Sequence, residues 1–456
     1  MKKIIVYTLL LMLAAALPSC YWISGYSVAD LTLNLSTPSA KGPDDRYARV
    51  WLIADNKIYP LREASKFVEI PLAANSNPEI QLTLEDIPVG PAYRVWLALG
   101  REQSGGWFLT DGWAESQSFK LAAGENTRVP FTEEDLFAIT PFQPVWELMG
   151  KSLKGVVVDQ FDTIVTAERE AVYSASGGPS SFASTTVPGG HAINSLDAGI
   201  DVDSPDQVLA WLNTNRGIVP FNDLTFDTDF SSSLGSVSVL GSAARETSGG
   251  STAWFFRDGG LGGAYIDLDI AWNPASWNWA NLESERVYDC ITDFPGNGFF
   301  ATSGGAFKLP REFLLDSSPS IDENKVQLDT PAKVFSWGLV DQFGDGDTLL
   351  MGTADGAWSV QMNDGVFQGA AVREPNTAGH AIRLIAVADY PPVFKAYLSD
   401  SDLFIWNGAA GSWSRFPLCA GLPGKITGMA WLRIVTVPVI DYLIVSGEEG
   451  LVYLVL

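Results

Sequence analysis

The stretch Thr353-Ala354-Asp355-Gly356-Ala357-Trp358-Ser359-Val360 holds the pattern that decides the fold. A small residue is followed by Gly three positions later, and by bulky apolar residues five and seven positions later. The apolar run Leu349-Leu350-Met351 comes just before it, so the unit is predicted to be strand, tight turn and strand. Gly suits the turn because it adopts a positive φ at little steric cost.

The same pattern recurs along the last two-thirds of the chain. The copies at Thr302 and Thr214 are complete, the copy at Ser399 has Asp in the place of Gly, and the copy at Ser446 has one extra residue. A copy at 166 lacks the Gly, and the copy at 260 is the loosest. The seven copies begin at residues 166, 214, 260, 302, 353, 399 and 446. Their spacing of 42 to 51 residues is the period of a β-propeller blade, which is built from short strands.

Seven copies predict a seven-bladed β-propeller over residues 139–456. The chain ends directly after the post-turn strand of the seventh copy, so we expect residues 144–149 to supply the missing strand and close the ring. The alternative is a series of unrelated hairpins in one large sandwich. The turn pattern resembles the two-component-regulator-type and quinoprotein-type propeller repeats. This resemblance implies an architecture and not an activity, because propellers host many functions.

Residues 27–138 are predicted to form a separate β-sandwich, so that the whole chain is all-β. Short runs with period-2 alternation, such as Leu31-Thr32-Leu33-Asn34-Leu35 and Tyr93-Arg94-Val95-Trp96-Leu97, indicate half-buried antiparallel strands. The stretch Ile87-Pro88-Val89-Gly90-Pro91-Ala92-Tyr93 resembles an edge turn of the transthyretin-like accessory sandwiches of bacterial surface proteins.

The N-terminus is predicted to be a targeting segment. Two lysines precede an apolar run from Ile4 to Leu17, which is shorter than the roughly 20 residues that span a bilayer. Leu17-Pro18-Ser19-Cys20 resembles the bacterial lipobox, which implies removal of residues 1–19 and a lipid on Cys20. Residues 20–26 would then be a lipidated tether. The alternative is an ordinary signal peptide with an incidental Cys.

Composition excludes some classes of partner and site. The 456 residues contain 29 Lys and Arg against 53 Asp and Glu, giving a formal net charge of −24. A strongly acidic chain lacks the basic surface that nucleic acids require, so we expect no nucleic-acid partner. Two His and three Cys leave little material for His or Cys metal sites. Once Cys20 is lipidated, Cys290 and Cys419 remain, and two buried free thiols are favoured over a disulfide.

Catalytic motifs are scarce. His191 and His380 lie in loops, no Ser or Asp adjoins either in the sequence, and we interpret both as exposed loop histidines. Asp341, Asp345 and Asp347 alternate in a Gly-rich loop, which would suit Ca²⁺, although solvated acidic turns explain them as well. No other cofactor is expected.

Three tryptophans mark a candidate ligand-binding loop. Trp272, Trp277 and Trp279 lie among Asn, Pro and Ser residues, and exposed rings there would stack on a sugar or contact a protein. The alternative is that the rings are buried between blades.

The sequence therefore favours a bacterial cell-envelope lipoprotein, on the outer membrane if the host has two membranes. The membrane would hold the chain through its N-terminal lipid, and the propeller would bind a protein or glycan partner without catalysis. The alternative is a secreted carbohydrate-active hydrolase or lyase that uses carboxylates in the propeller funnel. Three or more acids from different blades at one mouth would favour the enzyme.

Overall fold

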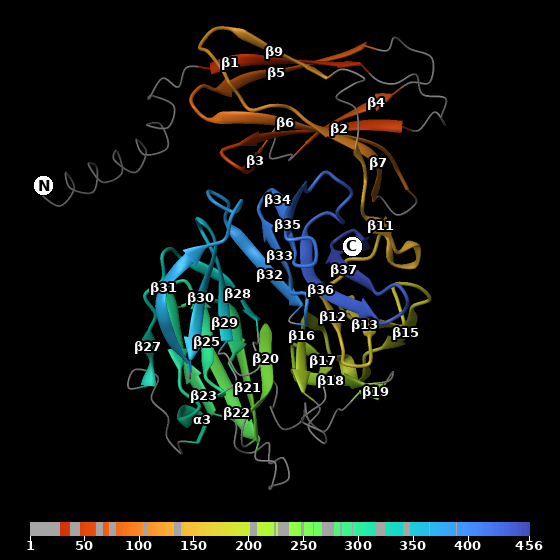
Figure 1. Cartoon of the computed structure of the whole chain (residues 1–456). Coiled ribbons are helices and arrows are strands. Elements are labelled where there is room, and N and C mark those ends of the chain that lie inside the picture. The colour runs from red at the N-terminus through yellow and green to blue at the C-terminus, as the bar shows by residue number, and fades with distance from the viewer. Residues whose placement is uncertain are drawn as a thin grey trace, which may run out of the picture. The chain divides into compact units, whose positions relative to one another are not determined.

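The computed structural model divides into two compact units, the first built from residues up to Arg101 and from Thr110 to Ile139, the second from Glu102–Leu109 and Thr140–Leu456 (Figure 1). No helix in the part of the chain that it describes is long and apolar enough to cross a membrane. The described residues are 28–36, 46–60, 67–72, 79–103, 107–131, 138–200, 208–222, 225–226, 237–247, 250–258, 260–266, 278–282, 285–293, 295–315, 324–340, 347–363, 365–388 and 390–456.

The first unit is a sandwich of two sheets. In the smaller sheet, β1 lies between β5 and β9, antiparallel to β5 and parallel to β9. In the larger sheet the order is β10-β7-β6-β2-β3, with β4 also paired to β2 and β8 to β6. The bounds are β1 (Val28–Ser36), β2 (Arg46–Ala54), β3 (Lys57–Tyr59), β4 (Val68–Leu72), β5 (Glu79–Pro88), β6 (Ala92–Glu102), β7 (Phe108–Glu115), β8 (Phe119–Lys120), β9 (Asn126–Phe131) and β10 (Ala138–Ile139).

Both sheets contribute to one hydrophobic core. Leu33 of β1, Val50 and Leu52 of β2 and Val95 of β6 belong to the same buried cluster. Along β2 the buried residues alternate with partly exposed ones, as the period-2 pattern predicted. Because each strand turns every second side chain inward, two such sheets bury their apolar faces only against each other.

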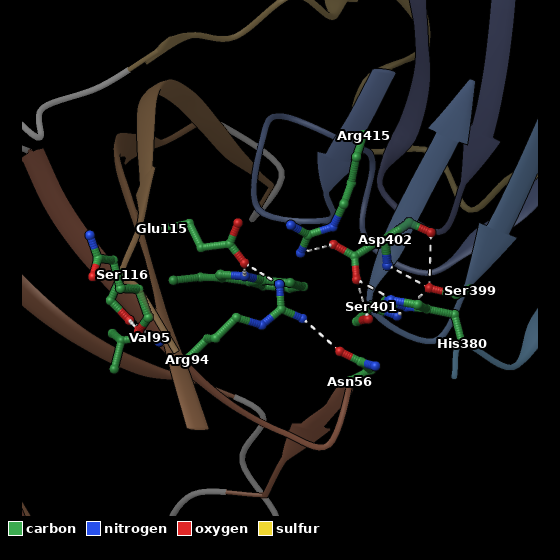
Figure 2. Close-up of polar contacts among 12 residues, drawn as sticks. Asn56, Arg94, Val95, Glu115, Ser116, His380, Ser399, Ser401, Asp402 and Arg415 are labelled. Atoms are coloured by element: carbon green, nitrogen blue, oxygen red, sulfur yellow. Dashed lines mark hydrogen bonds and ion pairs between the residues drawn. The ribbon is translucent and has the colours of Figure 1, made fainter. Parts of the chain in front are cut away.

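The turn between β5 and β6 gives a physical reason for the Ile-Pro-x-Gly motif. The hydroxyl of Tyr93 donates a 2.7 Å hydrogen bond to the carbonyl of Pro88, which ties the start of β6 to the end of β5. Burial, followed by the nearby Tyr59 and Asp55, raises the pKa of Tyr93 to about 12, so the phenol keeps its proton and donates. In the same sheet Arg94 donates to Glu115 and to Asn56, and the indole of Trp96 donates to Glu115 (Figure 2).

In its described residues, the second unit contains seven four-stranded sheets arranged as a β-propeller. The first three blades are β12 (Val156–Val158), β13 (Thr163–Ala167), β14 (Ala171–Ser176) and β15 (Ala183–Thr186); β16 (Ile193–Ile200), β17 (Val208–Thr214), β18 (Gly217–Asn222) and β19 (Thr225–Phe226); and β20 (Gly241–Thr247), β21 (Gly250–Arg257), β22 (Gly260–Ile266) and β23 (Asn278–Asn281).

The next three blades are β24 (Val287–Thr292), β25 (Gly298–Thr302), β26 (Gly305–Leu309) and β27 (Val326–Gln327); β28 (Val334–Val340), β29 (Asp347–Thr353), β30 (Gly356–Asn363) and β31 (Val366–Arg373); and β32 (Ile382–Ala388), β33 (Phe394–Ser399), β34 (Asp402–Asn407) and β35 (Ser412–Pro417). The seventh blade joins β36 (Ile426–Ile434), β37 (Ile440–Gly447) and β38 (Gly450–Val455) to β11 (Gln143–Pro144). Short helices are η2 (Trp146–Leu148), η3 (Pro188–Gly190) and α3 (Glu312–Leu315).

The ring closes through a strand from the start of the second unit. Gln143 pairs with Tyr453 and Pro144 with Val452, so β11 becomes the outer strand of the last blade (Figure 1). The segment expected to supply this strand, 144–149, begins at its end, and Trp146–Leu148 folds as a 3₁₀ helix instead. The innermost strands contact one another around the whole ring, including β12 with β36. A closed ring removes the unpaired edge that an open sheet would expose.

The repeat pattern has a hydrogen-bonding reason that the spacing alone does not give. Thr353 donates from its hydroxyl to the carbonyl of Gly356 at 2.8 Å and accepts from the amide of Asp355 at 3.1 Å. Thr302 and Thr214 make the same pair of bonds in their own turns. Gly356 has φ +112, a backbone conformation that a residue with a Cβ rarely adopts, and this explains the Gly at that position. In these three blades the small first residue of the repeat is therefore a hydroxyl that closes the turn.

Blade 3 corrects one position of the repeat. The pattern placed its first residue at 260, whereas β21 ends at Arg257, which pairs with Gly260. Gly260 is thus the turn glycine of this blade, and Arg257 holds the place of the hydroxyl residue. The loose match arose because this blade replaces the small residue by Arg.

Candidate binding site at the propeller channel

The innermost strands of all seven blades line a central channel of about 540 Å³. The innermost strands begin in the same way in five blades. In each of these a β-bulge follows the first residue of the strand, which is Ile193, Val287, Val334, Ile382 or Ile426. A bulge re-aims the side chains next to it. Because the innermost strands all begin at one mouth of the channel, these residues mark that mouth, which we call the rim.

Two aspartates lie in the channel wall. Asp197 of β16 accepts hydrogen bonds from the amide of Ser242 and the side chain of Asn213, at 2.8 and 2.6 Å. Asp289 of β24 accepts from the amides of Trp337 and Cys290, both at 2.8 Å. Both bind the backbone of the following blade, and both keep partial exposure because they line the channel.

The surrounding protein shifts the titration of both wall acids. Burial raises the pKa of Asp197 to about 6, against the opposing effect of its hydrogen bonds. Burial, with the charge of Asp197 as a smaller cause, raises the pKa of Asp289 to about 7. Near neutral pH the two acids therefore share a reduced negative charge, as expected for coupled carboxylates. Within the described part of the chain, Asp197 and Asp289 are the Asp or Glu residues that line the channel. They come from two blades, whereas acids from three blades would favour an enzyme.

The rim carries cations and aromatic rings in alternation across blades 4, 5 and 6. The guanidinium of Arg286 lies 5.8 Å and the ammonium of Lys333 5.1 Å from the ring centre of Tyr288. The ring of Phe335 lies 5.9 Å from the ammonium of Lys333 and 4.0 Å from the guanidinium of Arg383. The two rings contact each other edge to face, with centroids 5.7 Å apart. We call these five residues the cation–aromatic ladder.

A short sequence signal could have found the ladder. Arg286-Val287-Tyr288 and Lys333-Val334-Phe335 share the order cation, Val, aromatic, and the Val in each is the first residue of an innermost strand. The repeat pattern is defined by the hairpin turns, and the start of the innermost strand lies outside it. In the seventh blade the same place holds Lys425, followed by Ile426 and the non-aromatic Thr427.

Both histidines lie in loops, as predicted, but His380 is buried and His191 is only partly exposed. His380 is 8 % exposed, its Nδ1 lies 3.5 Å from Oδ2 of Asp402, and its ring packs on Phe404. Asp402 is fully buried and also pairs with Arg415 at 2.6 Å (Figure 2). Asp402 therefore lies beside a histidine from which it is far in the sequence.

This cluster contains Ser, His and Asp, but its hydrogen bonds serve the turn. The hydroxyl of Ser399 donates to the carbonyl of Asp402 and accepts the amide of Ser401. A nucleophile would instead present its hydroxyl to the histidine as base, beside space for a substrate. The arrangement fastens a buried loop to the blade.

His191 occupies the equivalent place in blade 2. Its Nδ1 lies 3.0 Å from the hydroxyl of Thr214, the turn residue of that blade. Burial, and to a smaller extent Arg216, lowers the pKa of His191. Both histidines stand in a Gly-His-Ala-Ile sequence directly before an innermost strand, and this repeated tetrapeptide is the signal that would have revealed their shared role.

Several predicted site residues lie outside the described residues: Cys20, Trp272, Trp277, Asp341 and Asp345. Trp279 lies in strand β23, where it pairs with Gly262, and not in a loop. Asp347 begins β29 and is buried. Within the described ranges no three His, Cys, Asp or Glu residues come together as metal ligands, and a calcium site at 341–347 stays a prediction. Cys290 and Cys419 are both buried, as predicted.

No family model matches the chain. No curated protein matches it either. Among solved structures, the extracellular domain of the hybrid two component system BT3049 from B. thetaiotaomicron is 12 % identical, with a TM-score of 0.46 over 83 % of this chain and 53 % of that one. The extracellular domain of the one component system BT4673 from B. thetaiotaomicron is 12 % identical, with a TM-score of 0.44 over 87 % of this chain and 61 % of that one.

PorZ, a surface component of the type-IX secretion system of Porphyromonas gingivalis, is 14 % identical, with a TM-score of 0.42 over 68 % of this chain and 37 % of that one. The chain thus aligns with only part of each of these three structures. At such scores the likeness carries no argument, and the fold assignment rests on the strand pairing described above.

Proposed function

We propose that the protein is a bacterial envelope lipoprotein whose propeller is a non-catalytic binding module. Cys20 carries the lipid, the transthyretin-like sandwich is a spacer, and the propeller, akin to two-component-regulator-type repeats, holds a protein or glycan partner at the rim. The lipobox supports the anchor. The binding role rests on one observation: three cations and two aromatic rings gather at the mouth of the channel.

The ladder would stabilise the fold poorly if its only role were structural. Arg286 and Lys333 are exposed, and like charges held close together repel one another. Exposed cation–aromatic contacts contribute only about 0.5–1 kcal/mol each, so they add little to the stability of the fold. A cluster that contributes little to stability and presents charge at a concave mouth fits a binding role better than a packing role.

The binding proposal is tested by blocking the rim. Lys154 lies in the channel lining just before blade 1 and is not part of the ladder, whereas Val372 is 65 % exposed on the outer strand β31. Residues 21–456 carrying Lys154→Cys or Val372→Cys are coupled to a polyethylene-glycol maleimide and used to capture crosslinked partners from a native envelope extract. We expect the coupled Lys154→Cys chain to lose a stoichiometric partner that the coupled Val372→Cys chain retains.

Two controls complete this experiment. Cys290 and Cys419 are buried, and the wild-type chain treated with the same reagent measures any coupling to them. Capture that is equal in both coupled variants would contradict binding at the rim. Capture of nothing by the uncoupled chain would contradict the binding module altogether.

The lipid anchor is tested separately. A Cys20→Ser chain expressed in a bacterial host should lose incorporation of a labelled fatty acid and leave the membrane fraction. Ser19→Ala, which keeps the Cys and a small residue before it, is the matched control and should behave as wild type. A Cys20→Ser chain that still incorporates the label would overturn the anchor.

The carbohydrate-active alternative keeps one observation in its favour, the raised pKa values of Asp197 and Asp289. Acids with such pKa values serve as proton donors near neutral pH. Incubation of the mature chain with a panel of polysaccharides distinguishes the two functions. Cleavage that Asp289→Asn abolishes would establish the enzyme, whereas retention of a glycan without cleavage fits the binding module.

A further inference from the structure

The charge of the ladder opposes that of the chain. The whole sequence has a formal net charge of −24, yet blades 4, 5 and 6 each place one cation at the rim: Arg286, Lys333 and Arg383. Arg383 also pairs with Asp400 at 2.8 and 3.1 Å. Among the described residues no acid pairs with Arg286 or Lys333, whose contacts are with the aromatic rings. Within the described residues, two of the three positive charges therefore contact aromatic rings and no paired acid, which leaves them able to meet an external anion.

The rings hold the cations ready for such an anion. Tyr288 and Phe335 are half-buried and contact each other, so they form a fixed base for long, otherwise flexible side chains. Binding to pre-positioned cations costs less side-chain entropy than binding to free ones. Arg also pairs with a carboxylate through two parallel hydrogen bonds, which favours carboxylates over less directional anions.

The channel wall keeps an anion at the rim. Asp197 and Asp289 line the channel, and their residual negative charge near neutral pH repels a carboxylate that moves inward. A ligand with several carboxylates laid along the rim of blades 4 and 5 would meet the cations there and stay outside the acidic channel. An extended peptide places every second side chain on one face, roughly 6.6 Å apart, and so offers successive carboxylates to successive cations.

We propose that the rim binds an acidic peptide segment of a protein partner, with its Asp and Glu carboxylates on Arg286 and Lys333. A peptide is favoured over an acidic glycan because each ring already contacts two cations of the chain, so neither ring offers the open face on which a sugar stacks. This inference rests on the proposed binding function and specifies the chemistry of its partner.

The test uses a fluorescent octaglutamate peptide and the mature chain, residues 21–456, with binding followed by anisotropy. Lys333→Ala removes the cation shared by both rings and should weaken binding about tenfold or more, while Lys333→Arg should restore it. Lys425→Ala is the matched control: Lys425 is exposed at the same place in blade 7, pairs with Glu448 at 3.6 Å and has no ladder ring beside it. It should change the affinity less than twofold. Added salt should weaken binding to the wild-type chain.

Each other outcome overturns the inference. Equal losses for Lys333→Ala and Lys425→Ala would show unspecific attraction to cations, and no binding of octaglutamate would exclude the peptide. Polygalacturonate that binds through Lys333 while octaglutamate does not would identify an acidic glycan instead. Because Lys333 is exposed, its variants should keep the wild-type urea midpoint. If the peptide fails while the rim-blocked chain still loses its partner, the binding function stands and only the acidic chemistry falls.

Discussion

Blades 2 and 6 show how one repeat position decides the chemistry of a turn. Both place a Gly-His-Ala-Ile loop beside a hydroxyl residue, Thr214 in one and Ser399 in the other. In blade 2 the residue three positions later is Gly217, with φ +107, and it pairs with Thr214 in the strand ladder. In blade 6 it is Asp402, which does not take a positive φ, and the ladder ends one pair earlier, at Leu398 and Leu403.

The difference teaches that these two turns share the hydroxyl and not the glycine. Ser399 keeps both hydrogen bonds of its equivalents although the glycine is gone. Asp402 instead adds a buried carboxylate that meets His380, Ser401 and Arg415. Blade 6 therefore joins its turn, loop and outer strand through one charge, whereas blade 2 relies on backbone geometry.

Loss of the blade 6 carboxylate should have the largest effect. Asp402→Ala should lower the free energy of unfolding by about 3 kcal/mol, because His380, Ser401 and Arg415 would lose a fully buried carboxylate as their partner. The measurement is the urea midpoint followed by tryptophan fluorescence. Asp400→Ala is the matched control, since Asp400 pairs with Arg383 near the surface, and should cost less than about 1 kcal/mol. Equal costs for the two would show that burial of Asp402 is unimportant.

The glycine form of the turn can be broken in blade 5. Gly356→Ala should cost about 2 kcal/mol, because φ is +112 and an added Cβ would lie 3.0 Å from the carbonyl of Thr377. Gly369→Ala is the control: its φ is +83, but nothing lies within 4 Å of the added atom, so about 1 kcal/mol is expected. Similar urea midpoints for the two variants would show that close packing at the turn adds nothing to the backbone cost.

The comparison also marks the limit of prediction from the sequence. The seven-bladed all-β fold follows from the spacing of Gly356 and its equivalents, because a tight turn restricts the residue types at fixed positions. The meeting of His380 and Asp402 does not follow, because it depends on how a loop folds back on a hairpin 22 residues later in the chain. The ladder was predictable only in part: the order of Arg286 and Tyr288 repeats in blade 5, but the contact between blades is tertiary.

Removal of the turn hydroxyl tests whether it stabilises the turn with glycine and the turn with Asp402 to the same extent. Thr353→Val and Ser399→Ala should each cost about 1–2 kcal/mol, since each leaves an amide and a carbonyl of its turn without their side-chain partner. The urea midpoints of the two variants should fall together. A loss confined to Ser399→Ala would mean that the glycine turn does not need its hydroxyl, which would reverse the conclusion drawn from blades 2 and 6.

The smallest effect concerns the histidine of blade 2 and depends on pH. Burial, then the charge of Arg216, lowers the pKa of His191 below its ordinary value of about 6.5, so the folded chain binds a proton less readily than the unfolded chain. The contribution of the neutral ring is therefore present above pH 6.5 and is lost as the pH falls. When the pH falls from 7.5 to 5.5, the free energy of unfolding of the wild-type chain should decrease more than that of His191→Gln. The difference should be smaller than the loss of stability in Thr353→Val or Ser399→Ala. Parallel pH profiles of the urea midpoint for wild type and His191→Gln would contradict this.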